Sequence, residues 1–108
     1  MKTIIERDVV VSMSNPPHPG EIVREDCMAA MGLTVAATAE GLGVPTQALS
    51  DLIEERKPVS PEMALRLELA GWGSAEGWLR SQAVFDLWRV KRDAGALRVH
   101  RFIENLSA

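Results

Sequence analysis

The chain has 108 residues, of which 46% are hydrophobic and 25% charged, and its formal net charge is −3. This composition is typical of one globular domain with a modest core, and it excludes an intrinsically disordered chain. The sequence has no apolar run of membrane-spanning length, no signal-peptide pattern and a single cysteine, Cys27. We therefore expect a cytoplasmic protein with no membrane segment and no internal disulfide.

The charge is unevenly distributed along the chain. Residues 1–59 carry five Lys/Arg against nine Asp/Glu, whereas residues 60–108 carry seven Lys/Arg against six Asp/Glu. The N-terminal half is the acidic half. Phosphate attraction should be weak if that half binds a nucleic acid.

Residues 1–17 are predicted to form an extended N-terminal arm. Ile4-Ile5 and Val9-Val10-Val11 favour extended backbone, and Pro16-Pro17 end any regular element. A lone strand has nothing to pair with in a helical domain. The arm is therefore either mobile or a strand that pairs with another chain.

His18-Pro19-Gly20-Glu21 predicts the start of a first helix, because proline suits the first helical position and Glu21 complements the positive helix end. We expect this helix to run to about Met31 and to end at Gly32. Its predicted buried face comprises Ile22, Val23, Cys27, Ala30 and Met31. His18 is assigned a positional role at the helix cap, since no other His or Cys near it has the spacing of a metal site.

Residues 34–53 predict two short helices that meet at a tight corner. Thr34 is the expected N-cap, Ala39 is small where the helices cross, and Gly43 can adopt the left-handed conformation that ends the first of them. Val44, Leu49 and Leu52 supply apolar contacts between the two. These offsets are typical of a helix-turn-helix, although an ordinary helical hairpin would need similar residues.

Two further helices follow in the sequence. Ser60 and Pro61 predict the start of the fourth, whose inward residues are Met63, Ala64, Leu67, Leu69 and Ala70. Ser74 opens the fifth, which should run to about Arg92. Its aromatic residues exceed what one small core needs, so they either cover the first and fourth helices or form a dimer interface at Trp78, Phe85 and Trp88.

Residues 93–108 are predicted to be a C-terminal tail or a short final helix. Leu97, Val99, Phe102, Ile103 and Leu106 repeat there at near-helical spacing. An enzyme is not expected, because the chain has two distant His, one cysteine of buried character and no glycine-rich phosphate loop. The sequence indicates no catalytic residue, no metal site and no cofactor.

Four segments of the chain resemble the HigA family of antitoxins over roughly residues 16–92. They are His18-Pro19-Gly20-Glu21-Ile22-Val23-Arg24-Glu25, Gly43-Val44, Ser60-Pro61-Glu62-Met63-Ala64-Leu65-Arg66-Leu67 and Trp78-Leu79-Arg80-Ser81-Gln82-Ala83-Val84-Phe85-Asp86-Leu87-Trp88. The resemblance implies an all-α fold, with a five-helix, lambda-repressor-like helix-turn-helix domain over residues 18–92 and an extended N-terminal arm. It also implies a homodimer that neutralises a HigB-type mRNA-endonuclease toxin and represses its own operon at a palindromic operator.

Carried onto this sequence, the resemblance places Thr34, Val35, Thr46, Gln47, Ser50, Arg56 and Lys57 at the DNA. Gln47 is the candidate for base readout, because a glutamine amide can pair bidentately with adenine. Val35 cannot hydrogen-bond a phosphate. Glu54 and Glu55, which precede Arg56 in the sequence, repel one. Two alternatives therefore stay open: a stand-alone helix-turn-helix repressor, and a toxin-binding module with weak DNA binding.

Overall fold

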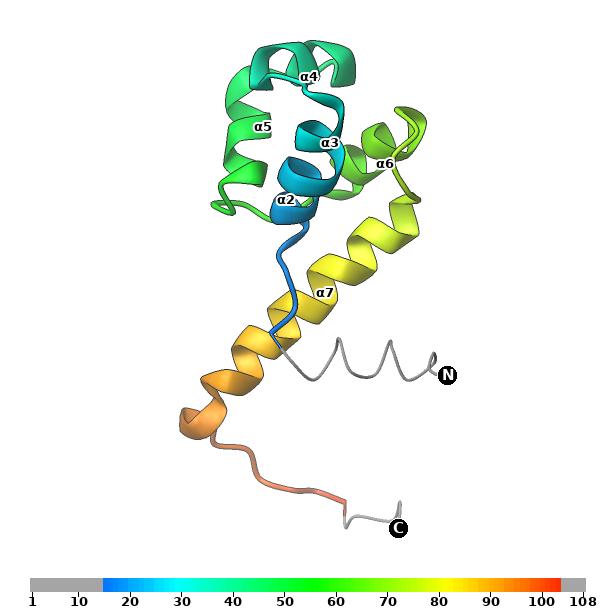
Figure 1. Cartoon of the computed structure of the whole chain (residues 1–108). Helices are drawn as coiled ribbons and strands as arrows, with labels where there is room; N and C mark the ends of the chain where they lie inside the picture. Colours follow the sequence, from blue (N-terminus) through cyan, green and yellow to red (C-terminus); the bar gives the residue numbers. More distant parts are fainter. Residues whose placement is uncertain (1–14, 104–108) are drawn as a thin grey trace, which may run out of the picture.

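The computed structural model describes residues 15–103, so all but the last residues of the expected N-terminal arm lie outside the described residues. Within this range the chain is all-α, which confirms the predicted fold class (Figure 1). A first helix runs without a break through α2 (Pro19–Ile22), a π-helical segment (Val23–Met28) and α3 (Ala29–Met31). It is followed by α4 (Val35–Leu42), α5 (Thr46–Ile53), α6 (Pro61–Leu69), α7 (Ala75–Arg92) and a 3₁₀ turn (Ala94–Ala96).

Side chains cap the helices at the positions that the sequence indicates. Each cap accepts a hydrogen bond from a backbone N–H two or three residues later: His18 from Gly20, Thr34 from Ala37, Ser60 from Met63 and Ser74 from Gly77, at 2.9–3.1 Å. Gly32 and Gly43 end their helices in the left-handed conformation, with φ of 65° and 73°. The predicted helix boundaries are thereby confirmed.

The first helix departs from the predicted burial pattern. Val23, Cys27 and Met28 are buried, whereas Ala30 and Met31 are exposed, so the prediction that the last two face the core is wrong. The cause is the π-helical segment, which holds more residues in a turn than an α-helix and rotates the residues that follow it. Burial also raises the pKa of the Cys27 thiol, with the charge of Asp26 adding to the effect, as expected for a packed rather than a reactive cysteine.

The core lies where these helices meet. The first helix packs on α5 and α7, α4 packs on α5, and α6 packs on α7. Leu49, Leu67 and Val23 are among the fully buried side chains. Leu69 and Ala70 were predicted to face inward but are exposed. Leu69 follows the buried Leu67 by two residues, which places it about 200° around the helix, on the opposite side.

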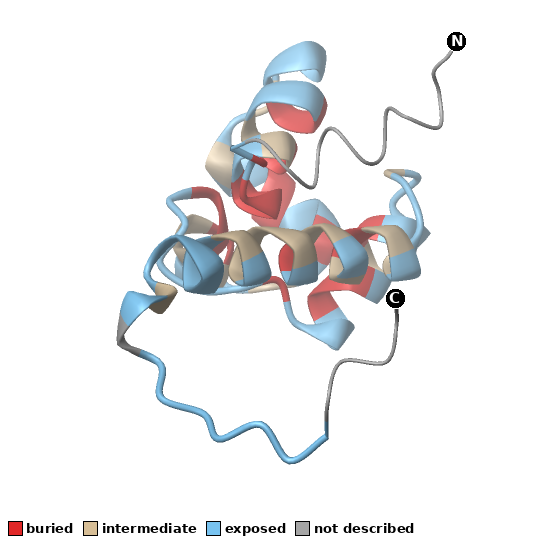
Figure 2. Cartoon of the chain, turned by 90° about the horizontal axis from the view of Figure 1, so that it is seen from below, coloured by how far each residue is buried: buried red, intermediate tan, exposed pale blue. Residues whose placement is uncertain are grey.

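The longest helix, α7, extends well beyond the body formed by the other helices (Figure 1). Seen from below, the buried residues gather within that body, and the described part of the chain after α7 is mostly exposed (Figure 2). Leu97, Val99, Phe102 and Ile103 lie in non-helical backbone and are 65–90% exposed, so residues 97–103 form a tail and not a helix. Leu106 lies outside the described residues. Among the described helices, none combines the length and the apolar character needed to cross a bilayer.

Candidate nucleic-acid interface

The corner between α4 and α5 is held by a contact from α6. Ala39 is 2% exposed, and its small side chain allows α4 and α5 to cross closely. The guanidinium of Arg66 donates through Nη1 to the carbonyl of Leu42 at 2.8 Å, and it pairs with Glu62 at 2.8 Å. One of the carbonyls that the end of α4 leaves unpaired is thus satisfied by a side chain from a different helix. This contact fixes the direction in which the chain leaves α4.

The first helix lies against the backbone of α5. A Cβ atom added to Gly20 would come within 1.8 Å of the carbonyl oxygen of Leu52, so only glycine fits there. From the same helix, the Arg24 guanidinium donates to the carbonyl of Ile53 at the end of α5. Arg24 and Arg66 are therefore used to cap helices and do not project freely toward a phosphate backbone.

This packing leaves one face of α5 available to a ligand. Leu49, Leu52 and Ile53 are buried, whereas Thr46 and Gln47 are exposed and Ser50 is half-buried. The three polar residues share a face at the N-terminal end of α5, as the sequence predicts. Hydroxyl and amide groups at such positions can hydrogen-bond base edges in a major groove.

The start of α4 offers less than its sequence position suggests. Thr34 is exposed, but its hydroxyl oxygen accepts from the Ala37 N–H at 3.0 Å. Val35 is half-buried and packs against the core. These residues present a helix N-terminus to solvent, where a phosphate is favoured by the helix dipole and not by a side-chain charge.

Arg56 and Lys57, the basic residues after α5, are paired within the chain. Arg56 donates through Nε to the Asp51 carboxylate at 3.0 Å and also pairs with Glu54. Lys57 Nζ lies 3.5 Å from the other Asp51 oxygen. The pKa of Arg56 is raised, first by its hydrogen bond to Glu54 and then by that to Asp51. A phosphate must compete with these carboxylates for both cations.

Asp51 also belongs to this surface, although it was not among the residues predicted from the sequence. Its Oδ1 accepts from Gln47 Nε2 at 2.9 Å, besides the contacts from Arg56 and Lys57. The hydrogen bond from Gln47 is the first cause that lowers the pKa of Asp51, and Arg56 and Lys57 add to it. The available signal was the spacing, since residues four apart on a helix are neighbours.

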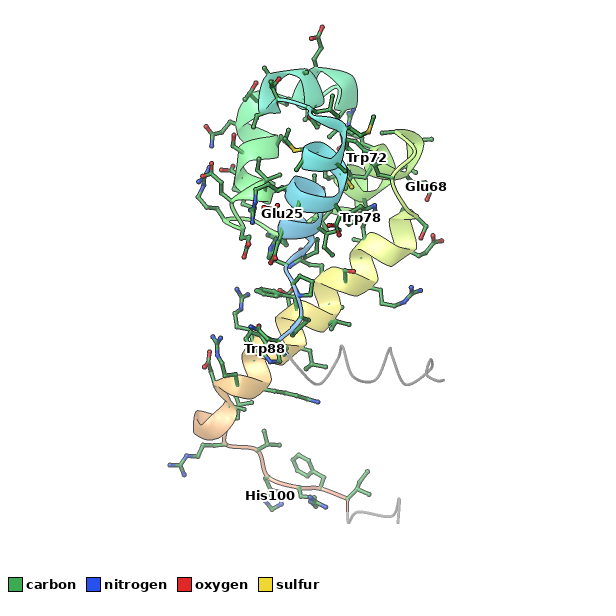
Figure 3. The ribbon with its side chains drawn as sticks, viewed as in Figure 1. Glu25, Glu68, Trp72, Trp78, Trp88 and His100 are labelled. Carbon is green, nitrogen blue, oxygen red and sulfur yellow. The ribbon has the colours of Figure 1, made fainter. Side chains whose placement is uncertain are left out.

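The residues expected at a dimer interface fall into two environments. Trp78 is buried in the core, and its indole N–H donates to the carbonyl of Trp72 at 2.6 Å. Phe85 and Trp88 are half-buried farther along α7, where the Arg89 and Arg92 guanidinium groups lie over their rings at 5.3 and 4.8 Å. Figure 3 shows Trp72 and Trp78 near the junction of α6 and α7, and Trp88 well away from them. Of the three predicted interface residues, Phe85 and Trp88 are the ones that a partner can still reach.

The sequence is similar to several known proteins, although no protein-family model matches it. It is 42% identical over 82 residues to the virulence-associated protein A of Dichelobacter nodosus, covering 75% of this chain and 80% of that protein. It is 34% identical over 76 residues to the antitoxin HigA-1 of Vibrio cholerae, covering 70% of this chain and 71% of that protein.

Solved structures of antitoxins are also similar to this chain. The antitoxin GraA superposes with a TM-score of 0.73 at 37% identity, over 81% of this chain and 99% of its own. The Pseudomonas aeruginosa antitoxin HigA, solved with the higBA promoter, superposes with a TM-score of 0.71 at 26% identity, over 82% of this chain and 99% of its own.

Proposed function

The chain belongs to the HigA family of antitoxins, and from this membership we propose that it is the antitoxin of a type II toxin–antitoxin module. In this role it neutralises a HigB-type toxin and represses its own operon by binding a palindromic operator. The proposal that the chain binds DNA rests on the orientation of α5. Its apolar residues are buried against the first helix and α4, and its polar face is left exposed.

Gln47 is the residue that we assign to base readout, with Thr46 and Ser50 beside it on the same face. Thr34 and Val35 place the N-terminus of α4 at a phosphate, and Arg56 and Lys57 contact the backbone next to the groove. Since α5 itself carries no Arg or Lys and the adjacent cations are paired with acids, binding should be specific but weak. The P. aeruginosa HigA structure with its promoter supports this assignment by homology.

We assign the homodimer interface to the distal half of α7. Phe85 and Trp88 are half-buried on one side of the helix there, and Leu87 and Val90, on the other side, are 54% and 53% exposed. A dimer would also place two copies of α5 on half-sites about one helical turn of DNA apart. Sedimentation at micromolar concentration should show a dimer that Trp88→Ala weakens, and a wild-type monomer would contradict this assignment.

The acidic N-terminal half suits a basic partner, and a toxin that acts on ribosome-bound RNA tends to be basic. The test uses the small gene adjacent to the one that encodes this chain. Its product alone should arrest bacterial growth, and co-expression of this chain should restore growth. The chain should also lower expression from a reporter fused to its own promoter.

The two readouts separate the alternatives. Repression without growth rescue would indicate a stand-alone repressor, and rescue without repression would indicate a toxin-binding module with weak DNA binding. The absence of both effects would contradict the proposed function.

A further inference from the structure

We infer that Asp51 is a positioning residue for DNA recognition, which fixes the orientation of the Gln47 amide and of the loop that follows α5. This inference rests on the proposed operator binding and deepens it. Asp51 lies one helical turn after Gln47 on the same face, and its side chain is only 13% exposed. It is therefore placed under the DNA-facing surface and not at its tip.

The Asp51 carboxylate determines whether the nitrogen or the oxygen of the Gln47 amide points toward it. An ionised carboxylate can only accept hydrogen bonds, so it must face the Nε2 group of Gln47, which lies 2.9 Å from Oδ1. One N–H of that amide is used in this contact. The second N–H and the carbonyl Oε1 make no hydrogen bond to the described residues, and they are the donor and acceptor that pair with N7 and N6 of an adenine.

Without this contact the amide would be free to rotate. A glutamine side chain has several rotatable bonds, and ordering it on binding costs conformational entropy. An exposed amide can also present its oxygen and nitrogen in either order, which blurs the distinction between a base that donates and one that accepts. A fixed amide removes part of both costs and discriminates better between bases.

Asp51 organises the following loop through two of its groups. Its side chain holds Arg56 at 3.0 Å and Lys57 at 3.5 Å, and its backbone carbonyl accepts from the N–H groups of the same two residues at 2.8 and 3.2 Å. The loop is thus tied to the last turns of α5. The same carboxylate also reduces the attraction of Arg56 and Lys57 for phosphate, so Asp51 favours sequence discrimination at the expense of total affinity.

The experiment measures binding of the full chain to its operator and to a random duplex of equal length. The operator is first located by footprinting in the promoter that precedes the gene. Asp51→Ala should bind the random duplex more tightly than the wild type, because it frees Lys57 and removes one of the two acids that hold Arg56. Its operator-to-random affinity ratio should fall about threefold to tenfold, within the range of coupling between side chains in direct contact.

The double variant Gln47→Ala/Asp51→Ala decides between positioning and independent action. If Asp51 acts through Gln47, the double variant should have the same affinity ratio as Gln47→Ala alone. Additive losses would overturn the inference, because Asp51 would then contact a base or shape the surface by itself. An unchanged ratio in Asp51→Ala would overturn it as well.

Separate controls test whether the Asp51 variants fold and whether the proposed function holds. Asp51→Asn keeps the size of the side chain and allows either amide orientation, so it should retain the melting temperature of the wild type more closely than Asp51→Ala and still lose part of the ratio. Wild-type protein that fails to select any operator would contradict the proposed function itself. Wild-type selectivity that survives in both Asp51 variants would contradict only the role of Asp51.

Discussion

The α-carbon of Gly20 lies so close to the carbonyl oxygen of Leu52 that a methyl group on it would come within 1.8 Å of that oxygen. This approach joins the start of the first helix to the last turn of α5. It also gives a physical reason for glycine in the His-Pro-Gly-Glu sequence: His18 caps the helix, Pro19 starts it, and Gly20 allows α5 to dock. The position of α5 depends on this contact.

Gly20→Ala should therefore destabilise the protein and disturb α5. We expect a loss of about 3 kcal/mol in the free energy of unfolding, the upper end for overpacking, because the clash is with backbone and not with a flexible side chain. The matched control is Gly41→Ala. Gly41 is exposed within α4, and a Cβ there would meet no atom of the described residues within 4 Å. This control should stabilise the protein by about 1 kcal/mol. Urea denaturation of both variants checks the pair, and equal effects would contradict the packing argument.

The loop after α5 contains a backbone strain that can be relieved. Glu55 has a φ of 62°, a left-handed conformation that costs a residue with a Cβ about 1 kcal/mol or more. Glu55→Gly should raise the free energy of unfolding by about that amount and strengthen DNA binding by removing a negative charge. Glu55→Gln removes the charge and keeps the strain, so it should improve DNA binding without the gain in stability. A stability gain of the same size in both variants would show that strain is not the cause.

Arg66 should contribute to stability through the end of α4. Arg66→Met keeps the aliphatic stem but leaves the Leu42 carbonyl without its charged donor, and we expect a loss of about 1.5 kcal/mol. Arg80→Met, on the exposed surface of α7, is the control and should change stability little. The melting temperatures of Arg66→Met and Arg80→Met, each compared with that of the wild type, test this prediction. A loss in the control as large as that in Arg66→Met would mean that the α4 contact is unimportant.

Stability should fall as the pH is lowered below neutrality, and His18 is a cause. Burial lowers the pKa of His18 from its ordinary value of 6.5, while the charges of Glu55 and Asp86 oppose the shift and that of Arg89 adds to it. Because the folded state binds this proton less readily than the unfolded state, the stabilisation is present above pH 6.5 and is lost as the pH falls toward the lowered value. The Asp51 pKa is lowered from 3.8, so its stabilisation is lost only in a more acidic range.

The control for this pH dependence is His18→Asn, because asparagine can cap the helix without titrating. Melting temperatures between pH 7.5 and 5 should fall less steeply for this variant than for the wild type. Parallel curves would show that His18 does not titrate with unfolding.

The elements of the fold could be predicted because their signals are local. Thr34, Ser60 and Ser74 mark helix starts by side-chain chemistry, and Gly43 marks a helix end by its backbone freedom. The burial of Met28 and the exposure of Met31 could not be predicted in the same way, since the π-helical segment has no simple sequence signature. The predicted burial assumed an α-helical period throughout, whereas Val23–Met28 is π-helical.

The candidate site was predictable in its face but not in its contacts. The resemblance to the HigA family predicted Thr46, Gln47 and Ser50, and the structure leaves them exposed or half-buried on one face of α5. The roles of Arg24 and Arg66 depend on which carbonyls lie within reach in the folded chain, and counting charges along the sequence cannot show this. The same holds for Trp78. The number of aromatic residues on its helix suggested a dimer interface, but in the folded chain Trp78 is buried in the core.

The most direct test of the account is the effect of Gln47→Ala on binding to operator and random DNA, measured by fluorescence anisotropy at two salt concentrations. We expect a loss of about 1–3 kcal/mol on the operator and almost none on random DNA. The salt dependence should be shallow and nearly unchanged, since each neutralised phosphate adds about 0.9 to the log–log slope and Gln47 neutralises none. Equal losses on both DNAs, or no loss on either, would contradict the assignment of α5 as the helix that reads the operator.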